Sequence, residues 1–303
     1  MTFVLVLAAM PAEAAPLLPH LAHPSEISTH GSFTVCSGTL NPAPEALPTE
    51  PDQLAKTSHR VKTVPCAETD HPAETSHRVK PDHPNDPDHR IQVALITTGI
   101  GIANAASAAT WGISTYSPDL VISIGSCGGL AADIEVGTLV IGDSFSYSIA
   151  DATAFGYEIG QVPGMPARFD AAPDLADLAT QAATRIRPHL TTAGEDPVRR
   201  GLMLSGDAFV TAPLADGMRT RFPGALTADM ESTAIAQVCH NFDLPFVAIR
   251  SVSDLCGPRA DQQFHLTLDV VAENSVRALI ATLTSPGLAT PTSPTISQPQ
   301  ARP

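Results

Sequence analysis

Short segments that are apolar throughout recur along the chain, and each is followed by a polar or glycine-rich stretch. They include Phe3–Ala9, Val93–Ile96, Leu120–Ile124 and Pro245–Ile249. Strands without polar alternation are buried on both faces, as in a mostly parallel sheet covered by helices. Ligands bind to such sheets beyond the carboxyl ends of the strands. The pattern therefore predicts an α/β protein whose ligand site is built by the segments that follow its strands.

Four of these following segments carry residues suited to a site. Glu13 follows the first strand, Gly99–Gly101 and Gly125–Gly129 follow the next two apolar strands, and Ser253–Asp254 follows the last. We expect them to converge as loops at one edge of the sheet. Further strands are expected at Ser32–Leu40, Thr138–Ile141 and Gly201–Leu204, and helices at Ala14–Ala22, Asp174–Arg187, Met230–Cys239 and Val270–Leu283.

Two stretches lack the apolar periodicity of a core. Residues 41–90 hold nine of the 28 prolines and five of the eleven histidines, and 285–303 is a Ser/Thr/Pro-rich tail. We expect one domain, 1–284, interrupted by a disordered insertion at 41–90 and followed by a disordered tail. Within the insertion Thr57–Lys62 recurs as Thr75–Lys80. Its histidines could bind a metal, but duplication of a hydrophilic segment is the simpler interpretation.

Composition excludes several classes of protein. The net charge of −14 disfavours binding to nucleic acid, which needs Lys and Arg for the phosphates. No apolar run approaches the roughly 20 residues that span a bilayer, so we expect no membrane segment. The first Lys or Arg is Lys56, which disfavours a secretory signal. Five cysteines without a CxxC pair favour reduced thiols and a cytoplasmic protein.

Each motif is weak when taken alone. The turn Thr98–Asn104 lacks the third glycine of a dinucleotide fingerprint. Cys127 has no recognisable histidine partner, so we interpret it as a small buried residue and not as a nucleophile. Glu231 could simply complement a helix dipole, and Asp254 could be a turn residue or an ion-pair partner. Phe209 could belong to the core.

The order of the motifs is more specific than any one of them. In sequence these are Ala9, Met10 and Glu13; Thr98–Gly101; Gly125–Leu130; Asp151–Tyr157 with Gly160–Pro163; Ser205–Phe209; Asp229–Glu231; and Ser253–Asp254. The series resembles the bacterial 5′-methylthioadenosine/S-adenosylhomocysteine nucleosidases of the purine nucleoside phosphorylase-like superfamily. The resemblance covers nearly all of the chain outside 41–90 and the tail.

This resemblance implies a three-layer α/β/α fold around a central twisted, mixed and mostly parallel sheet. It also implies a homodimer without a metal or organic cofactor, acting on small-molecule 5′-thio-adenosines in methionine salvage. The reaction would be hydrolysis of the N-glycosidic bond, which releases adenine and a 5-thio-substituted ribose. Such a reaction builds positive charge on the sugar and negative charge on the base, so a carboxylate near the sugar and an acid at the purine suit it.

The resemblance also implies roles for individual positions, carried over motif by motif. Glu13 would activate water, and Asp254, supported by Ser253, would protonate N7 of adenine; we expect the pKa of Asp254 to be raised. The other residues would bind the substrate or lie near it: Phe209 and Val210 at the adenine, Met230 and Glu231 at the ribose, Ser126 and Arg250 near the attacking water, and Ile100 and Gly128 with their backbone close to the ligand.

The chain departs from the family pattern at Ile102, Ser148, Leu268 and Cys256–Arg259, the last a four-residue insertion just after Asp254. These departures put substrate preference and the closing loop in question more than the reaction. Three alternatives stay open: a phosphate-dependent nucleoside phosphorylase, a futalosine hydrolase, and a non-catalytic nucleoside-binding protein. Phosphate needs convergent cationic groups, of which the site segments offer few, and retention of three acids argues against a mere binder.

Overall fold

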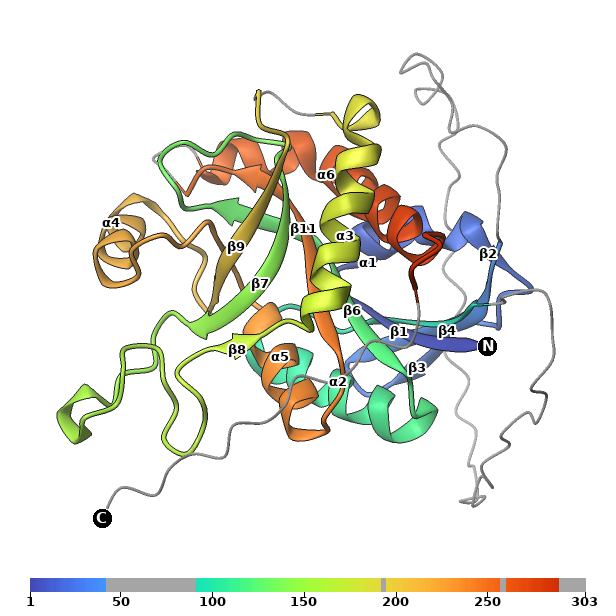
Figure 1. The fold of residues 1–303 in the computed structure, drawn as a ribbon, viewed down its shortest axis with the longest axis horizontal. Coiled ribbons are helices and arrows are strands. Elements are labelled where there is room, and N and C mark those ends of the chain that lie inside the picture. Colours follow the sequence, from blue (N-terminus) through green and yellow to red (C-terminus); the bar gives the residue numbers. More distant parts are fainter. Residues whose placement is uncertain (42–90, 192–194, 257–259, 289–303) are drawn as a thin grey trace. The chain divides into compact units, whose positions relative to one another are not determined.

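The computed structural model describes residues 1–41, 91–191, 195–256 and 260–288 of the 303-residue chain (Figure 1). Side chains are described from Leu268 onward in the last of these ranges. The Pro- and His-rich segment after Asn41 and most of the Ser/Thr/Pro tail lie outside the described residues. The expected disorder of these two segments therefore stays a prediction.

Parallel strands form the middle of the sheet, as the apolar segments predict. β1 (Thr2–Ala8) lies between β5 (Ile91–Thr97) and β6 (Leu120–Gly129) and is parallel to both, and β11 (Phe246–Asp254) is parallel to β6. Val6, for example, pairs with Leu95 on one side and Ile122 on the other, and all three side chains are buried. These contacts require side chains that are apolar on both faces of each strand.

The sheet is mixed, because antiparallel strands join the parallel ones. β4 (Phe33–Leu40) is antiparallel to β5, and β7 (Leu139–Tyr147) is antiparallel to β11 and parallel to β9 (Val198–Ser205). The order is β10-β9-β7-β11-β6-β1-β5-β4-β2. Shorter strands are β2 (Leu21–Ala22), β3 (Ser28–His30), β8 (Phe169–Asp170) and β10 (Thr227–Asp229).

Five of these strands close into a ring that the sequence analysis did not predict. β10 pairs parallel with β9 on one side and antiparallel with β6 on the other. The strands β6, β11, β7, β9 and β10 therefore form a closed ring in which each pairs with its two neighbours. The closing pairs are Thr227 with Gly129 and Ala228 with Gly128. Glycines at a strand end permit the bend and the close backbone approach that such closure needs.

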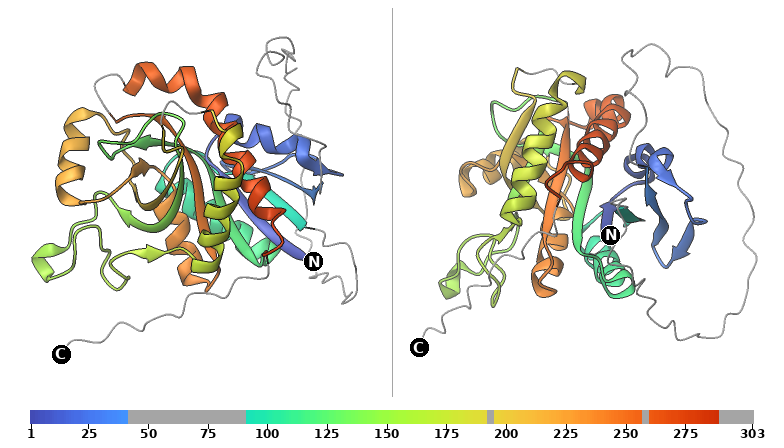
Figure 2. Two further views of the ribbon diagram at one scale, coloured as in Figure 1. Left: turned by 45° about the horizontal axis from the view of Figure 1, so that its top comes forward. Right: turned by 45° about the vertical axis from the view of Figure 1, so that its right-hand side comes forward.

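The helices pack on this sheet. They are α1 (Pro11–Ala14), α2 (Ile102–Tyr116), α3 (Pro173–Arg185), α4 (Ala212–Arg221), α5 (Ser232–Asn241) and α6 (Ala260–Leu283). α6 packs against β6, β11 and α3, whereas α2 packs against α5, β1 and β5 (Figure 2). The expected short helix at Ala14–Ala22 is instead α1 followed by a 3-10 helix at Ala15–His20, which contains the two prolines of that segment.

Two segments that the sequence predicts as loops belong to strands. Gly125–Gly129 is the second half of β6, and Ser253–Asp254 ends β11. Their hydrogen bonds continue because the strands are paired along these segments, with Ser251 opposite Ser126 and Asp254 opposite Gly128. Helix α5 starts at Ser232, two residues later than expected, and β7 runs six residues beyond Ile141 to Tyr147. The site residues in these two segments are therefore held by the sheet itself.

The core extends to the start of the expected tail. Ser285 is buried; its hydroxyl donates to the carbonyl of Ala281 and accepts a hydrogen bond from Arg185. Within the described ranges no helix combines the length and apolarity that crossing a bilayer requires.

Candidate active site

A cavity of about 230 Å³ lies at the carboxyl ends of the central strands. Segments that follow β1, β5 and β9 line it together with the ends of β6, β10 and β11. Every site residue named from the sequence lines this cavity except Arg250, which lies beside it; the lining set comprises Glu13, Ile100, Ser126, Gly128, Phe209, Val210, Met230, Glu231, Ser253 and Asp254.

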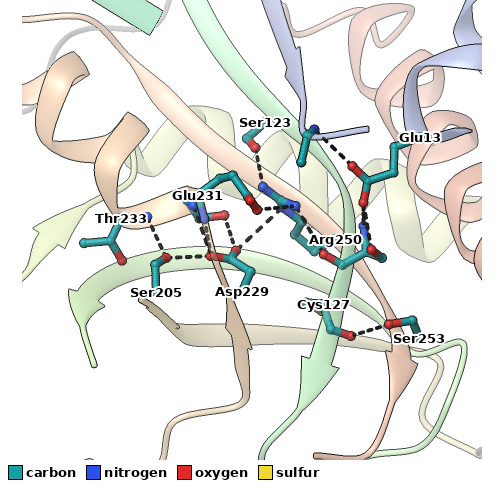
Figure 3. Close-up of polar contacts among 12 residues, drawn as sticks. Glu13, Ser123, Cys127, Ser205, Asp229, Glu231, Thr233, Arg250 and Ser253 are labelled. Atoms are coloured by element: carbon teal, nitrogen blue, oxygen red, sulfur yellow. Dashed lines mark hydrogen bonds and ion pairs between the residues drawn. The ribbon is translucent and has the colours of Figure 1, made fainter. Parts of the chain in front are cut away.

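Glu13 is buried in a nest of hydrogen-bond donors. One carboxylate oxygen accepts from the amides of Ala9 and Met10 at 3.0 and 3.1 Å. The other accepts from the amide and the hydroxyl of Ser126, both at 2.7 Å (Figure 3). Four donors directed at one side chain satisfy its buried oxygens and fix its position. A Cβ added at Gly125 would lie 2.6 Å from the carboxyl carbon of Glu13, so only glycine leaves room for this group.

Arg250 is a fully buried cation on β11, with 1% of its surface exposed. Its guanidinium donates to the hydroxyl of Ser123 at 2.9 Å and to the carbonyl of Ser126 at 3.2 Å. It also lies 3.7 Å from a carboxylate oxygen of Asp229 and 3.6 Å from one of Glu231. A buried charge requires such partners, so Arg250 and the two acids hold each other in place.

Asp229 is a site residue to which the sequence analysis gave no role. Its carboxylate accepts from the hydroxyl of Ser205 at 2.6 Å, from the amides of Glu231 and Ser232 at 3.1 Å each, and from the hydroxyl of Ser232. Asp229 thus caps the start of α5 and fixes the residue two positions ahead. The one signal in the sequence that could have identified Asp229 was its place immediately before the helix expected at Met230–Cys239.

Glu231 faces the turn that precedes α2. Its Oε1 accepts the amide of Gly101 at 2.9 Å, and its Oε2 faces Arg250. Burial raises the pKa of Glu231 to about 7, although the Arg250 charge and the Gly101 hydrogen bond act in the opposite direction.

Asp254 lies at the end of β11 and is 3% exposed. Its Oδ1 accepts from the hydroxyl of Ser253 at 2.9 Å, and its Oδ2 accepts from the amide of Cys256 at 3.3 Å. Burial raises the pKa of Asp254, against the effect of these two hydrogen bonds. Asp254 and Glu13 line one cavity, which is the geometry that an acid and a base acting on one substrate require.

Apolar side chains form the remaining walls. Val210 is buried, whereas Ile100 and Phe209 are 50% and 46% exposed. A cavity with apolar walls and a few convergent polar groups suits a small organic ligand. Leu268, one of the departures from the family pattern, is not among the residues that line it.

Two cysteines, Cys127 and Cys256, also line the cavity. Burial raises the pKa of Cys127 well above its ordinary value and that of Cys256 to about 12. Both are therefore neutral thiols near pH 7, and neutral thiols are poor nucleophiles. Within the described part of the chain, no three His, Cys, Asp or Glu side chains are grouped so that they could hold a metal ion.

Comparison with known proteins identifies the family. The family model of the phosphorylase superfamily matches residues 46–284, which is more than half of the chain. The chain therefore belongs to the phosphorylase superfamily.

Solved structures of nucleosidases and of a futalosine hydrolase are similar to this chain. The 5′-methylthioadenosine/S-adenosylhomocysteine nucleosidase of Neisseria meningitidis, solved with methylthio-immucillin-A, is 31% identical with a TM-score of 0.70, over 94% of this chain and 99% of that one. The Colwellia psychrerythraea nucleosidase, solved with adenine, is 27% identical with a TM-score of 0.72, over 93% and 94%. A futalosine hydrolase mutant of Helicobacter pylori shares the fold at 19% identity and a TM-score of 0.71, over 93% and 99%.

Proposed function

We propose that the protein hydrolyses the N-glycosidic bond of 5′-methylthioadenosine and S-adenosylhomocysteine, releasing adenine and the 5-thio-substituted ribose. The observation that carries this proposal is that Glu13 and Asp254 line one cavity, with Glu231 in the same cavity and Arg250 beside it. Nucleosidase relatives that are 31% and 27% identical support the choice of substrate. We further propose the three-layer arrangement, a homodimer and a cytoplasmic location.

Each acid has a distinct task in this mechanism. Glu13, whose two carboxyl oxygens are positioned by four hydrogen-bond donors, accepts a proton from water and stabilises positive charge on the sugar. Asp254, whose raised pKa favours the protonated form, donates a proton to N7 of the departing adenine. Glu231 accepts hydrogen bonds from the ribose hydroxyls together with the Met230 segment, and Phe209 stacks on the purine.

The charges of the site favour water over phosphate as the nucleophile. Phosphate binding needs cationic donors that are free to face it. Arg250 is already engaged by Asp229 and Glu231, and the Glu13 carboxylate occupies the donors beside it. An incoming phosphate would therefore meet uncompensated negative charge.

Adenine release tests the proposal. Purified protein is incubated with methylthioadenosine, S-adenosylhomocysteine, inosine or futalosine, each with and without phosphate, and the free base is measured. We expect release from the first two substrates at a rate that phosphate does not change. Release that requires phosphate would indicate a phosphorylase, and release from futalosine alone would indicate a futalosine hydrolase. Binding without any release would indicate a nucleoside sensor.

A further inference from the structure

Two separate segments meet at the mouth of the cavity. Ile100 belongs to the turn before α2, and Phe209 belongs to the loop between β9 and α4. Asp207, two residues before Phe209, joins these segments, because its Oδ1 accepts a hydrogen bond from the amide of Ile102 at 2.8 Å. The bond links residues that are 105 positions apart in the sequence.

The same turn also holds the acid assigned to the ribose. The amide of Gly101 donates to Glu231 at 2.9 Å, and the next amide, that of Ile102, donates to Asp207. Two successive amides thus bind carboxylates from two different segments of the chain. Gly101 has a φ of +103°, and a Cβ added to it would lie 2.9 Å from Asp207 Oδ1. Glycine is therefore required both for the shape of the turn and for the approach of Asp207.

We propose that Asp207 is a positioning residue that sets the affinity of the cavity for its nucleoside. Asp207 does not itself line the cavity. It acts by holding the loop of Phe209 and Val210 against the Gly101–Ile102 turn, so that the wall for the base and the acid for the ribose keep a fixed separation. The identity of the nucleoside rests on the proposed function.

A purely structural cap gives a different expectation. If Asp207 only satisfied the first amide of α2, its loss would lower stability and leave ligand affinity unchanged. If it positions the loop, its loss leaves the reacting groups intact, but fewer molecules hold the loop against the turn. The affinity for the ligand then falls in proportion to the fraction of molecules in which the Phe209 loop is held against the Gly101–Ile102 turn.

The test compares Asp207→Ala with Asp207→Asn, whose amide oxygen still accepts the hydrogen bond. Asp216→Ala is the matched control, since Asp216 lies on α4 with its side chain 79% exposed. For Asp207→Ala we expect the KM for methylthioadenosine and the Kd of the probe 5′-methylthiotubercidin each to rise about tenfold. We expect kcat to stay within about threefold of wild type. Asp207→Asn should recover most of the affinity, and the control should match wild type.

A lower Tm with unchanged KM and Kd would overturn the proposal, and so would a loss confined to kcat. If Asp207→Ala does not fold, Asp207→Glu places the same charge one methylene too far and should give the same rise in KM. Hydrogen exchange of ligand-free protein provides a readout that does not depend on the substrate. The amides of residues 100–102 and 208–210 should exchange faster in Asp207→Ala, and unchanged exchange there would overturn the proposal even if the proposed function is wrong.

Discussion

At the scale of single residues, the site depends on how burial and hydrogen bonds give three acids different surroundings. All three are buried: Glu13 accepts four hydrogen bonds, Glu231 faces Arg250 and one amide, and Asp254 accepts two hydrogen bonds. Burial raises the pKa of Glu231 and that of Asp254 despite these contacts. An acid and a base can then act at one pH.

Replacing Asp254 tests the acid. Asp254→Asn cannot transfer a proton, so we expect kcat on methylthioadenosine to fall at least about a hundredfold. In the wild type, burial raises the pKa of Asp254, so activity should fall on the alkaline side at a pH above the ordinary value of 3.8. This alkaline limb should be absent from the pH profile of the residual activity of Asp254→Asn.

The matched control is Asp133→Asn, because the Asp133 side chain is 75% exposed on the surface. It should keep both the rate and the profile of the wild type. Near-normal turnover by Asp254→Asn, with the alkaline limb intact, would show that another group protonates the base.

The pH dependence of binding tests Glu231. Under the proposed function the carboxylate of Glu231 accepts hydrogen bonds from both ribose hydroxyls, and burial raises the pKa of Glu231 to about 7. Affinity for 5′-methylthiotubercidin should therefore be constant above pH 7 and weaken by up to about tenfold per unit below it. Calorimetry between pH 5 and pH 8.5 measures this. Glu231→Gln, which does not titrate, should bind more weakly and with a flatter profile; an equally steep profile would assign the titration to another group.

At the scale of elements, the second half of β6 determines the site more than any loop does. Ser126 supplies two of the donors to Glu13 and Gly125 leaves the space for its carboxylate, while Gly128 pairs with β10 and closes the ring of strands. A strand is more rigid than a loop, so donors carried by it are preorganised.

A methyl group at Gly125 tests this role of β6. Gly125 has a φ of +139°, and its added Cβ would lie 2.6 Å from the carboxyl carbon of Glu13. Gly125→Ala should therefore lose activity by about a hundredfold or more and destabilise the fold by ~1–3 kcal/mol.

The control is Gly217→Ala on α4, where a Cβ meets nothing within 4 Å. It should stabilise the protein by ~0.5–1 kcal/mol and leave activity unchanged. Thermal melts and adenine release measure both variants. Full activity of Gly125→Ala would mean that Glu13 does not need its present position.

At the scale of the whole molecule, the strands on either side of the Pro- and His-rich segment pair directly with each other. β4 ends at Leu40 and β5 begins at Ile91, and the two strands are antiparallel neighbours, with Thr39 opposite Gln92. The described residues on either side of the segment therefore lie where a short hairpin could join them.

Deleting the segment tests whether it is needed. Replacing residues 43–89 with a linker of about four residues should leave adenine release unchanged, and Tm should shift by only a few degrees, since loop-closure entropy depends weakly on length. Activity and thermal melts measure the outcome. Insoluble or inactive protein would show that the segment contributes to folding or to the site.

Much of the site was predictable from local sequence. The apolar strands were located by their composition, and Glu13, Ser126 and Asp254 followed from acids and small polar residues placed after or at the ends of those strands. The roles of these residues stay proposals. The ends of β6 and β11 were wrongly expected to be loops, because glycine and serine are typical of turns unless a neighbouring strand pairs with them.

The sequence alone determined which segments are buried strands and which acids stand beside them, because burial on both faces demands apolar residues in a local run. The tertiary structure alone decided that β10 closes the ring, that Arg250 faces both Asp229 and Glu231, and that Asp207 reaches the amide of Ile102. These contacts join residues far apart in the chain. Their strength depends on distance and burial, which no local pattern of residues records.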